Sequence, residues 1–571
     1  MKSTFHWLFL IPILLILLIG SVRYTNWDDS VTAFYLYAND SDLERLWSRD
    51  VRSDDRIRGF GRWENERRNE QLRGFRFRGN TSRHHPKKSY NIRFEHPQRI
   101  LFNADRLNWN ALYTDPSGMR ERLAWGLFHD VGHPASQTRY VALYINDSYE
   151  GLGLSVQRID ETLLRNNRLN ANGTLVRDLT RRRVEERNSI FGYDISQEND
   201  PVAYVADMFT FRGNPNWSAV AELVQWAHDT PAGEVFAREF PKKFELENFI
   251  DWLALHYLFA DVDAYGDDYW LYRNTRSRRS KWMIIPWDHD LSFGKNERDN
   301  VPVHPELGQF GDGIVQLHDY FAYEYPIDDG GWGNALISKF LETDVLREKL
   351  HHRLEVLMQE IFPPSYFECR ISEISSEISE YMTREPSADE FKIHNQQHHG
   401  ALGFWEYHKE NIQDFIWLRY AFLDRALNPI EGELYTASVQ LSLSGERHML
   451  TDASGWTIAW FTPDNDISEE ITLSISSEAH EADGINQRWR VNTSAPVSGT
   501  LSLFYRNDIA PDGKENWFVT EDAVGRQWDL NIHQPNRENS TQITEIHRNP
   551  FSNKIEGRVS LNGEQEFFVV F

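Results

Sequence analysis

Alternating apolar and polar positions predict strands in the first part of the chain. "VTAFYLYA" (31–38) alternates and is rich in aromatic and β-branched residues, as half-buried strands are. "GFRFRG" (74–79) and "KKSYNIRF" (87–94) predict two more strands around a polar loop, and the charged stretch 50–73 predicts a surface hairpin or loop. Residues 139–160 read as two strands that turn at Asn146-Asp147.

Helical spacing then appears in three places. Residues 115–132 predict a helix that Asp115 or Ser117 caps and Gly132 ends. Residues 234–263 have helical periodicity, and 334–427 are helical almost throughout. Between them, "DYWLYRN" and "KWMIIPWD" predict a strand pair.

The pattern changes near Asn428-Pro429 to short alternating runs separated by turn residues. Such runs are typical of an immunoglobulin-like β-sandwich. We therefore expect an α+β chain with three parts: an N-terminal segment (1–25), a mixed domain (26–430) and a β-sandwich domain (431–571).

The N-terminus carries Lys2 followed by a nearly unbroken apolar run from Phe5 to Val22. This pattern indicates a signal peptide or an uncleaved signal-anchor, and we favour the anchor. The predicted location is therefore extracytoplasmic, in the cell envelope, either anchored to the membrane by this segment or secreted.

Charge and cysteine content exclude some classes of function. The 571 residues carry a formal net charge of −25, which argues against a generic nucleic-acid surface. The single cysteine, Cys369, excludes an intrachain disulfide, and we expect it to be a small buried side chain. The histidines of 394–400 are expected to lie in a polar loop that binds no metal.

Three short stretches carry candidate chemistry. Turn residues Asn80 and Ser82 precede Lys87 and Lys88, and turn amides with a nearby lysine can bind phosphate oxygens. Four carboxylates lie within 261–268, directly after an apolar helix. Taken alone, the lysine stretch is better explained as a solvated hairpin, and the acidic stretch equally well as an acidic loop.

The third stretch is "IIPWDHDLSFG" (284–294), where Asp288 and Asp290 follow an apolar strand. Carboxylates fixed at a strand end suit magnesium, which takes one or two of them together with substrate phosphates. A lysine on an early strand, an acidic loop and a strand-terminal aspartate follow one another in the order found in protein kinases.

The chain resembles the spore-coat-protein-H-like (CotH) kinases in five motifs over about residues 30–427. They are "RGNTSRHHPKKSYNIRF", "DPSGMRERLA", "LYINDSYEGLGLSVQRID", "DVDAYGDDYWLY" and "IPWDHDLSFG". The resemblance implies a bilobal protein-kinase-like fold. It also implies an enzyme that uses ATP with Mg²⁺ or Mn²⁺ to phosphorylate Ser/Thr of a surface or secreted protein.

The resemblance also implies roles for individual residues. Lys88, or else Lys87, would contact the ATP phosphates beside the turn of Asn80 and Ser82. Asp263 would be the catalytic base. Asp288, Asp268 and Asp290 would bind the metal ion.

Three positions depart from the family pattern. Asp261 and Asp268 stand where the family usually has Asn, and Gln157, in the segment leading to the adenine pocket, stands where it usually has Glu. These departures keep two alternatives open: transfer of AMP on the same fold, and an inactive surface scaffold. Glu121 has two readings, a partner for the phosphate-binding lysine or a favourable charge at a helix start, and we favour the second.

Overall fold

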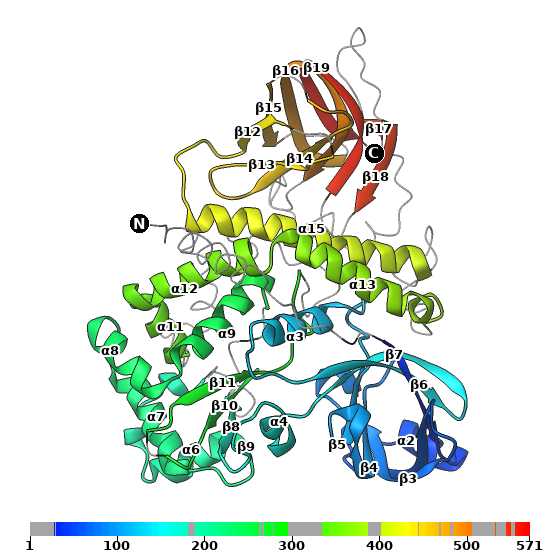
Figure 1. Ribbon diagram of the computed structural model, residues 1–571, viewed down its shortest axis with the longest axis vertical. Helices are drawn as coiled ribbons and strands as arrows, with labels where there is room; N and C mark the ends of the chain where they lie inside the picture. The colour runs from blue at the N-terminus through cyan, green and yellow to red at the C-terminus, as the bar shows by residue number, and fades with distance from the viewer. Residues whose placement is uncertain are drawn as a thin grey trace, which may run out of the picture.

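The computed structural model (Figure 1) describes residues 28, 30–180, 189–261, 264, 268–277, 279–294, 334–385, 401–442, 445–467, 470–479, 484–504, 531–532, 544–549 and 554–570. The predicted membrane segment, the histidine-rich stretch 394–400 and Asp263 lie outside these residues. Within the described part, no helix combines the length and apolar character needed to cross a bilayer.

The first part of the chain forms a closed barrel of seven strands in the order β1-β2-β3-β4-β5-β7-β6. The strands are β1 (Thr32–Tyr37), β2 (Ile57–Trp63), β3 (Glu70–Phe77), β4 (Tyr90–Gln98), β5 (Ala104–Asn110), β6 (Thr138–Ile145) and β7 (Ser148–Val156). β1 pairs in parallel with β6, which closes the barrel, and the other neighbours are antiparallel. Its interior is apolar and aromatic, as the alternating pattern predicts.

Short helices lie in the connections between the barrel strands, and one longer helix lies between the barrel and the rest of the molecule. The short ones are α2 (Asp40–Ser48), η1 (Thr81–Arg83) and η2 (Arg99–Leu101). The longer helix, α3 (Arg120–Asp130), is buried along almost its whole length. Its N-cap residue is Met119, not the expected Asp115 or Ser117, although Asp115 accepts a hydrogen bond from the Arg120 amide at 2.9 Å.

The residues that follow the barrel, which we call the second lobe, are built on a four-stranded sheet in the order β11-β10-β8-β9. Its strands are β8 (Thr174–Asp178), β9 (Phe209–Arg212), β10 (Tyr269–Arg273) and β11 (Trp282–Pro286). Its helical segments up to β10 are α4 (Glu161–Asn166), η3 (Ile190–Gly192), η4 (Ile195–Gln197), α6 (Pro201–Met208), α7 (Trp217–Asp229), α8 (Glu234–Lys243) and α9 (Leu246–Phe259). The expected strand pair 268–288 is β10 and β11, in antiparallel register.

Helices after the sheet join the two lobes to the C-terminal part. They are α11 (Ala335–Glu342), α12 (Asp344–Val356), the π-helical η5 (Leu357–Ile361), α13 (Pro364–Thr383) and α15 (Ala401–Leu427). α13 and α15 run side by side across the molecule above α3 and α9 (Figure 1). Cys369 on α13 is exposed, so the expectation of a buried cysteine is wrong, because it falls on the solvent side of an amphipathic helix.

The C-terminal strands hydrogen-bond into one eight-stranded sheet. They are β12 (Thr436–Leu441), β13 (His448–Thr451), β14 (Thr457–Pro463), β15 (Ile471–Ala479), β16 (Gly484–Phe504), β17 (Asn531–Ile532), β18 (Thr544–Asn549) and β19 (Lys554–Val570). The long β16 and β19 pair along most of their length and link the other strands into one network. The α+β class is therefore confirmed, whereas the bilobal protein-kinase-like fold, the immunoglobulin-like assignment and the domain boundaries stay predictions.

Candidate active site

The loop after β11 carries Asp288 and Asp290 and is held by three separate elements. The amide of Phe293 donates to the carbonyl of Phe259 at the end of α9, at 2.8 Å. The guanidinium of Arg120 on α3 donates to the Phe293 carbonyl at 3.3 Å. At Gly294 (φ 82°) an added Cβ would lie 2.9 Å from the Phe415 ring on α15. The tight packing fixes the backbone that presents the two carboxylates.

Asp288 itself has an unusual backbone conformation. Its φ of 57° lies in the left-handed region, which a residue with a side chain adopts at a cost of about 1 kcal/mol or more. Its side chain is half-buried. Because such conformations persist only where the surroundings enforce them, the loop is built to hold this carboxylate in one place.

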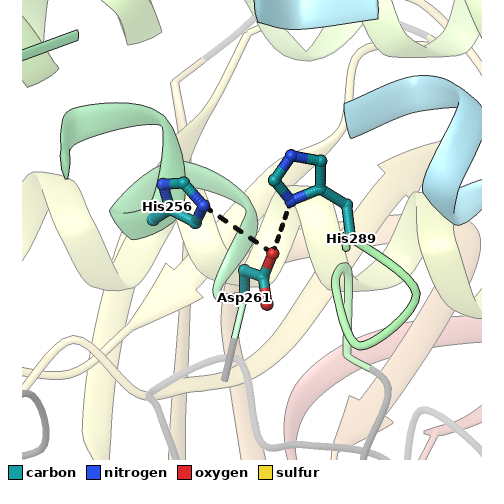
Figure 2. A group of neighbouring side chains, drawn as sticks. All are labelled: His256, Asp261 and His289. Carbon is teal, nitrogen blue, oxygen red and sulfur yellow. Dashed lines mark hydrogen bonds and ion pairs between the residues drawn. The ribbon is translucent and has the colours of Figure 1, made fainter. Parts of the chain in front are cut away.

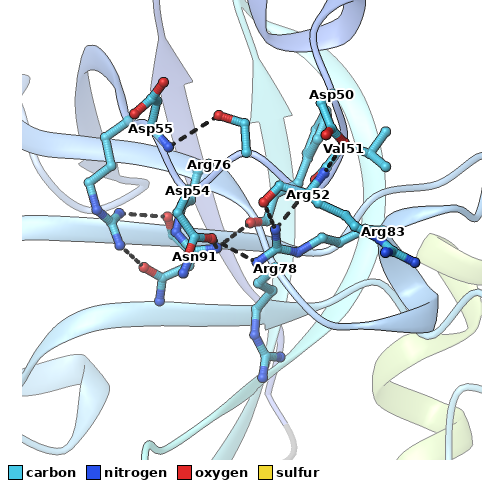
Figure 3. A network of polar contacts seen from close by, with 12 residues as sticks. Asp50, Val51, Arg52, Asp54, Asp55, Arg76, Arg78, Arg83 and Asn91 are labelled. Carbon is cyan, nitrogen blue, oxygen red and sulfur yellow. Dashed lines mark hydrogen bonds and ion pairs between the residues drawn. The ribbon is translucent and has the colours of Figure 1, made fainter. Parts of the chain in front are cut away.

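The turn after β3 is the second component of the site. Ser82 lies against Gly79, whose φ is 96° and where an added Cβ would approach Ser82 Oγ to 1.8 Å. Arg83 fastens the turn to the preceding loop: it donates to the Arg52 carbonyl at 2.8 Å and pairs with Asp54 at 3.0 Å (Figure 3). The exposed Asn80 lies at the tip of this turn.

Arg78, at the start of that turn, extends away from this network (Figure 3). Burial lowers the pKa of Arg78, and the negative charges of Asp288, Glu121 and Asp290 oppose that shift. The guanidinium of the barrel turn therefore lies in the field of three carboxylates from two other elements. The sequence patterns assigned no role to Arg78, although it belongs to the motif that begins with Arg78-Gly79-Asn80. Its position between the end of a strand and a glycine turn could have indicated one.

Glu121 in the first turn of α3 is the third component. Only 2% of the residue is exposed, and Asn110 Nδ2 donates to both carboxylate oxygens at 2.9 Å. Burial, and secondarily the charge of Asp288, raise the pKa of Glu121 to about 7, while Asn110, Trp125 and Arg78 act in the opposite direction. Glu121 is therefore a buried group in the first turn of α3 and not a solvated charge. Its pairing with a phosphate-binding lysine stays a prediction, because the contacts of Lys87 and Lys88 are made to other groups.

Arg78, Glu121, Asp288 and Asp290 lie close enough for their charges to influence one another, and we call them the acid–arginine cluster. One basic and three acidic groups come from the barrel, α3 and the loop after β11. An excess of carboxylates around one guanidinium is an arrangement that a divalent cation would stabilise.

Asp268 lies next to this cluster along the backbone. Its carbonyl accepts a hydrogen bond from the Trp287 amide at 3.1 Å, so it is a neighbour of the residue before Asp288. Its side chain is buried, and Oδ1 pairs with Arg177 on β8 at 2.6 Å. One oxygen of this predicted metal ligand is thus engaged by a cation of the protein.

The two lysines point to different surroundings. Lys87 Nζ donates to the Leu152 carbonyl at 2.6 Å and forms a buried ion pair with Glu385 at 2.9 Å. Lys88 Nζ donates to the Arg83 carbonyl at 2.8 Å and lies near the rings of Trp47 and Phe77. Burial lowers the pKa of Lys88, and no carboxylate of the described residues contributes to that shift. Both amines thus have partners within the protein, and the phosphate-binding role of Lys88 or Lys87 stays a prediction.

Gln157 lies just after β7, where the chain leaves the barrel for the second lobe. It is buried, and its Nε2 has no hydrogen-bond partner among the described residues. A buried amide donor without a partner costs about 1–3 kcal/mol unless a ligand supplies an acceptor. The atom therefore fits a role in binding a polar group such as the edge of a base.

Arginines from both lobes gather near the same junction. The pKa of Arg56 falls to about 10 through burial and the charges of Arg76, Arg93 and Arg106. That of Arg158 also falls to about 10, through burial and the charges of Arg212 and Arg106. Carboxylates of the protein offset part of this positive charge, since Asp54 pairs with Arg76 at 2.9 Å and Asp105 with Arg106 at 3.1 Å.

These observations define the class of the protein. It is an α+β protein in which carboxylates of α3 and of the loop after β11 lie near an arginine of a barrel turn. The model of the family described as "CotH kinase protein" matches residues 75–423, more than half of the chain, and the chain therefore belongs to this family.

Two relatives are similar to it. Inner spore coat protein H of Bacillus subtilis (strain 168) is 24% identical over 368 residues, which cover 62% of this chain and 88% of the relative. Invasin CotH3 of Rhizopus delemar is 28% identical over 196 residues, which cover 32% of this chain and 30% of the relative.

Proposed function

We propose that this protein is a CotH-type kinase that transfers the γ-phosphoryl group of ATP to Ser or Thr of a protein outside the cytoplasm. The observation that carries the proposal is the acid–arginine cluster, in which Arg78 lies in the field of Asp288, Glu121 and Asp290. Phosphoryl transfer needs positioning and neutralisation of charge, and a cation-binding carboxylate next to a fixed guanidinium supplies both.

Each residue has a role in this proposal. Asp288 and Asp290 would hold Mg²⁺ or Mn²⁺, with Asp268 beside them. Arg78 would bind phosphate oxygens, and Glu121 would orient Arg78, as a glutamate orients the phosphate-binding lysine in protein kinases. ATP supplies the phosphoryl group when bound.

The remaining roles concern the base and the nucleotide. Asp263, two residues beyond Asp261 in sequence, would accept the proton of the acceptor hydroxyl. Gln157 Nε2 would donate a hydrogen bond to the adenine. The turn of Asn80 and Ser82 would lie beside the phosphates of the nucleotide. Lys88 Nζ donates a hydrogen bond to the carbonyl of Arg83 at the end of this turn.

The names of the two relatives and the N-terminal sequence support the proposed location and the class of acceptor. One relative is named as a spore coat protein and the other as an invasin, and both names refer to surfaces. Together with the N-terminal apolar run from Phe5 to Val22, they support an extracytoplasmic protein that acts on surface or secreted partners, with membrane attachment through that run.

The test is label transfer by the purified full-length chain with Mn²⁺ and a generic protein acceptor. ATP labelled at the γ-phosphate should transfer label and ATP labelled at the α-phosphate should not. Asp288→Asn should reduce transfer by about 100-fold or more. Asp55→Asn, an exposed carboxylate on the barrel, is the matched control and should leave it unchanged. Transfer of the α-label would show AMP transfer instead.

One contact favours the second candidate, an inactive surface scaffold. The ion pair of Asp268 with Arg177 engages an oxygen that a metal would otherwise use. Absence of transfer from either label, with nucleotide binding absent as well, would support the scaffold and contradict the kinase.

A further inference from the structure

Three fully buried side chains meet where the end of α9 approaches the loop after β11. They are His256 on α9, Asp261 just beyond it, and His289, which lies between Asp288 and Asp290 in the loop after β11 (Figure 2). His289 Nδ1 lies 2.8 Å from Asp261 Oδ2, and His256 Nε2 lies 3.8 Å from the same oxygen. The three ligand atoms all lie within 4.8 Å of one another.

The hydrogen bonds determine which ring nitrogens carry protons. His256 Nδ1 lies 2.6 Å from the Trp252 carbonyl, so it must be the protonated nitrogen. In a neutral ring, the Nε2 lone pair then faces Asp261 Oδ2. Full burial disfavours the doubly protonated ring, so two electron-rich atoms face each other across this gap.

We propose that His256, Asp261 and His289 bind a divalent transition-metal ion, zinc, as a structural site separate from the acid–arginine cluster. The ligand atoms are His256 Nε2, Asp261 Oδ2 and His289 Nδ1. Two imidazoles and one carboxylate are a set of three protein ligands that binds zinc with a water molecule as the fourth ligand, and a water would complete the coordination here. When the ion binds, the proton of His289 Nδ1 moves to Nε2, which has no hydrogen-bond partner among the described residues.

The surroundings match those of bound histidine ligands. A metal-binding imidazole usually donates its other N–H to a carbonyl or carboxylate, and His256 does so to Trp252. Aromatic rings enclose the cluster: Trp125 lies 4.4 Å and Phe128 5.2 Å from the His289 ring, centroid to centroid. An enclosed site of this kind would limit access of solvent to the ion and slow its exchange.

The ion would join the two segments that carry the proposed catalytic carboxylates. Asp261 precedes Asp263 by two residues, and His289 lies between Asp288 and Asp290.

Ligand chemistry separates this site from the proposed magnesium site. Imidazole nitrogens favour zinc, whereas Mg²⁺ favours oxygen ligands such as those of Asp288 and Asp290. The proposal therefore does not depend on kinase activity.

The test is the metal content of the full-length chain. The protein is purified, incubated with Zn²⁺, dialysed against a weak chelator and measured by inductively coupled plasma mass spectrometry. We expect about one zinc per chain in the wild type and about a tenth of that or less in His289→Gln. His133→Gln is the matched control, because this buried histidine packs on Phe128 too but is not among the three ligands. It should retain the zinc.

Asp288→Asn should also retain the zinc, which distinguishes this site from the catalytic metal. Anomalous diffraction at the zinc edge from wild-type crystals gives a second readout that needs no variant, and a peak among the three residues is expected. Wild-type protein without zinc after this treatment, or His289→Gln with wild-type zinc content, would overturn the proposal in favour of a simple hydrogen-bonded cluster.

Discussion

The buried carboxyl of Glu121 gives a quantitative prediction for the substitution Glu121→Gln. Its pKa is raised from the ordinary 4.5 to about 7, chiefly by burial. Between these two values the folded protein binds a proton that the unfolded chain has released. Stability therefore falls as pH rises through this window, and the cost is fully present above about pH 7.

The magnitude follows from the difference between the two pKa values, which corresponds to about 3 kcal/mol. Gln carries no charge, so the substitution removes this cost at pH 8 and has little to remove at pH 4.5. Gln keeps one carbonyl oxygen for the Asn110 amide, which now donates to both oxygens at 2.9 Å. The gain at pH 8 is thus at most about 3 kcal/mol, or a rise in Tm of about 2–4 °C.

Differential scanning calorimetry of wild type and variant at pH 4.5 and pH 8 measures this effect. Glu95→Gln is the control, since Glu95 is an exposed partner of Arg73 at 3.2 Å and should change Tm little at either pH. If Glu121→Gln raised Tm equally at both values, or lowered it at pH 8, the carboxyl would not be a buried group with a raised pKa.

Two further pairs of substitutions test the barrel side of the site. Lys87→Met leaves Glu385 buried without its partner and should cost about 3–5 kcal/mol, whereas Lys88→Met should cost about 1 kcal/mol, with urea denaturation as the measurement; equal losses would contradict the different surroundings of the two lysines. Gly79→Ala places a methyl group 1.8 Å from Ser82 Oγ at a φ of 96° and should lower stability by about 1–3 kcal/mol. Adding Ser82→Ala should restore part of this loss in the same assay, and no restoration would refute the proposed clash.

Local patterns predicted the elements that local physics determines. The hairpin turn at Asn146-Asp147 has positive φ at both residues, 47° and 65°, as the turn residues indicate. The barrel strands alternate as expected, and the residues 50–73 form the β2–β3 hairpin. The single connected C-terminal sheet was not predictable, because strand length and partner choice depend on distant pairing, here of β16 with β19.

The acidic residues of the candidate site were predictable from the sequence, whereas its basic residue, Arg78, was not. Asp288 and Asp290 stand at a strand end, and their position follows from the apolar run before them. Lys87 and Lys88 are neighbours in sequence with different surroundings, and Glu385, the partner of Lys87, lies two residues beyond the end of α13. No local pattern reveals such a partner, nor that Arg78 is the group facing the acids.

The central claim is that Arg78, and not Lys88, shares a site with Asp288. Titration calorimetry of a non-hydrolysable ATP analogue with Mn²⁺ against wild type, Arg78→Met and Lys88→Met tests it most directly. We predict that Arg78→Met weakens binding by about 10-fold or more, as loss of a charge-assisted hydrogen bond should, while Lys88→Met stays within about 2-fold of wild type. Loss of affinity in Lys88→Met with wild-type affinity in Arg78→Met would contradict the account.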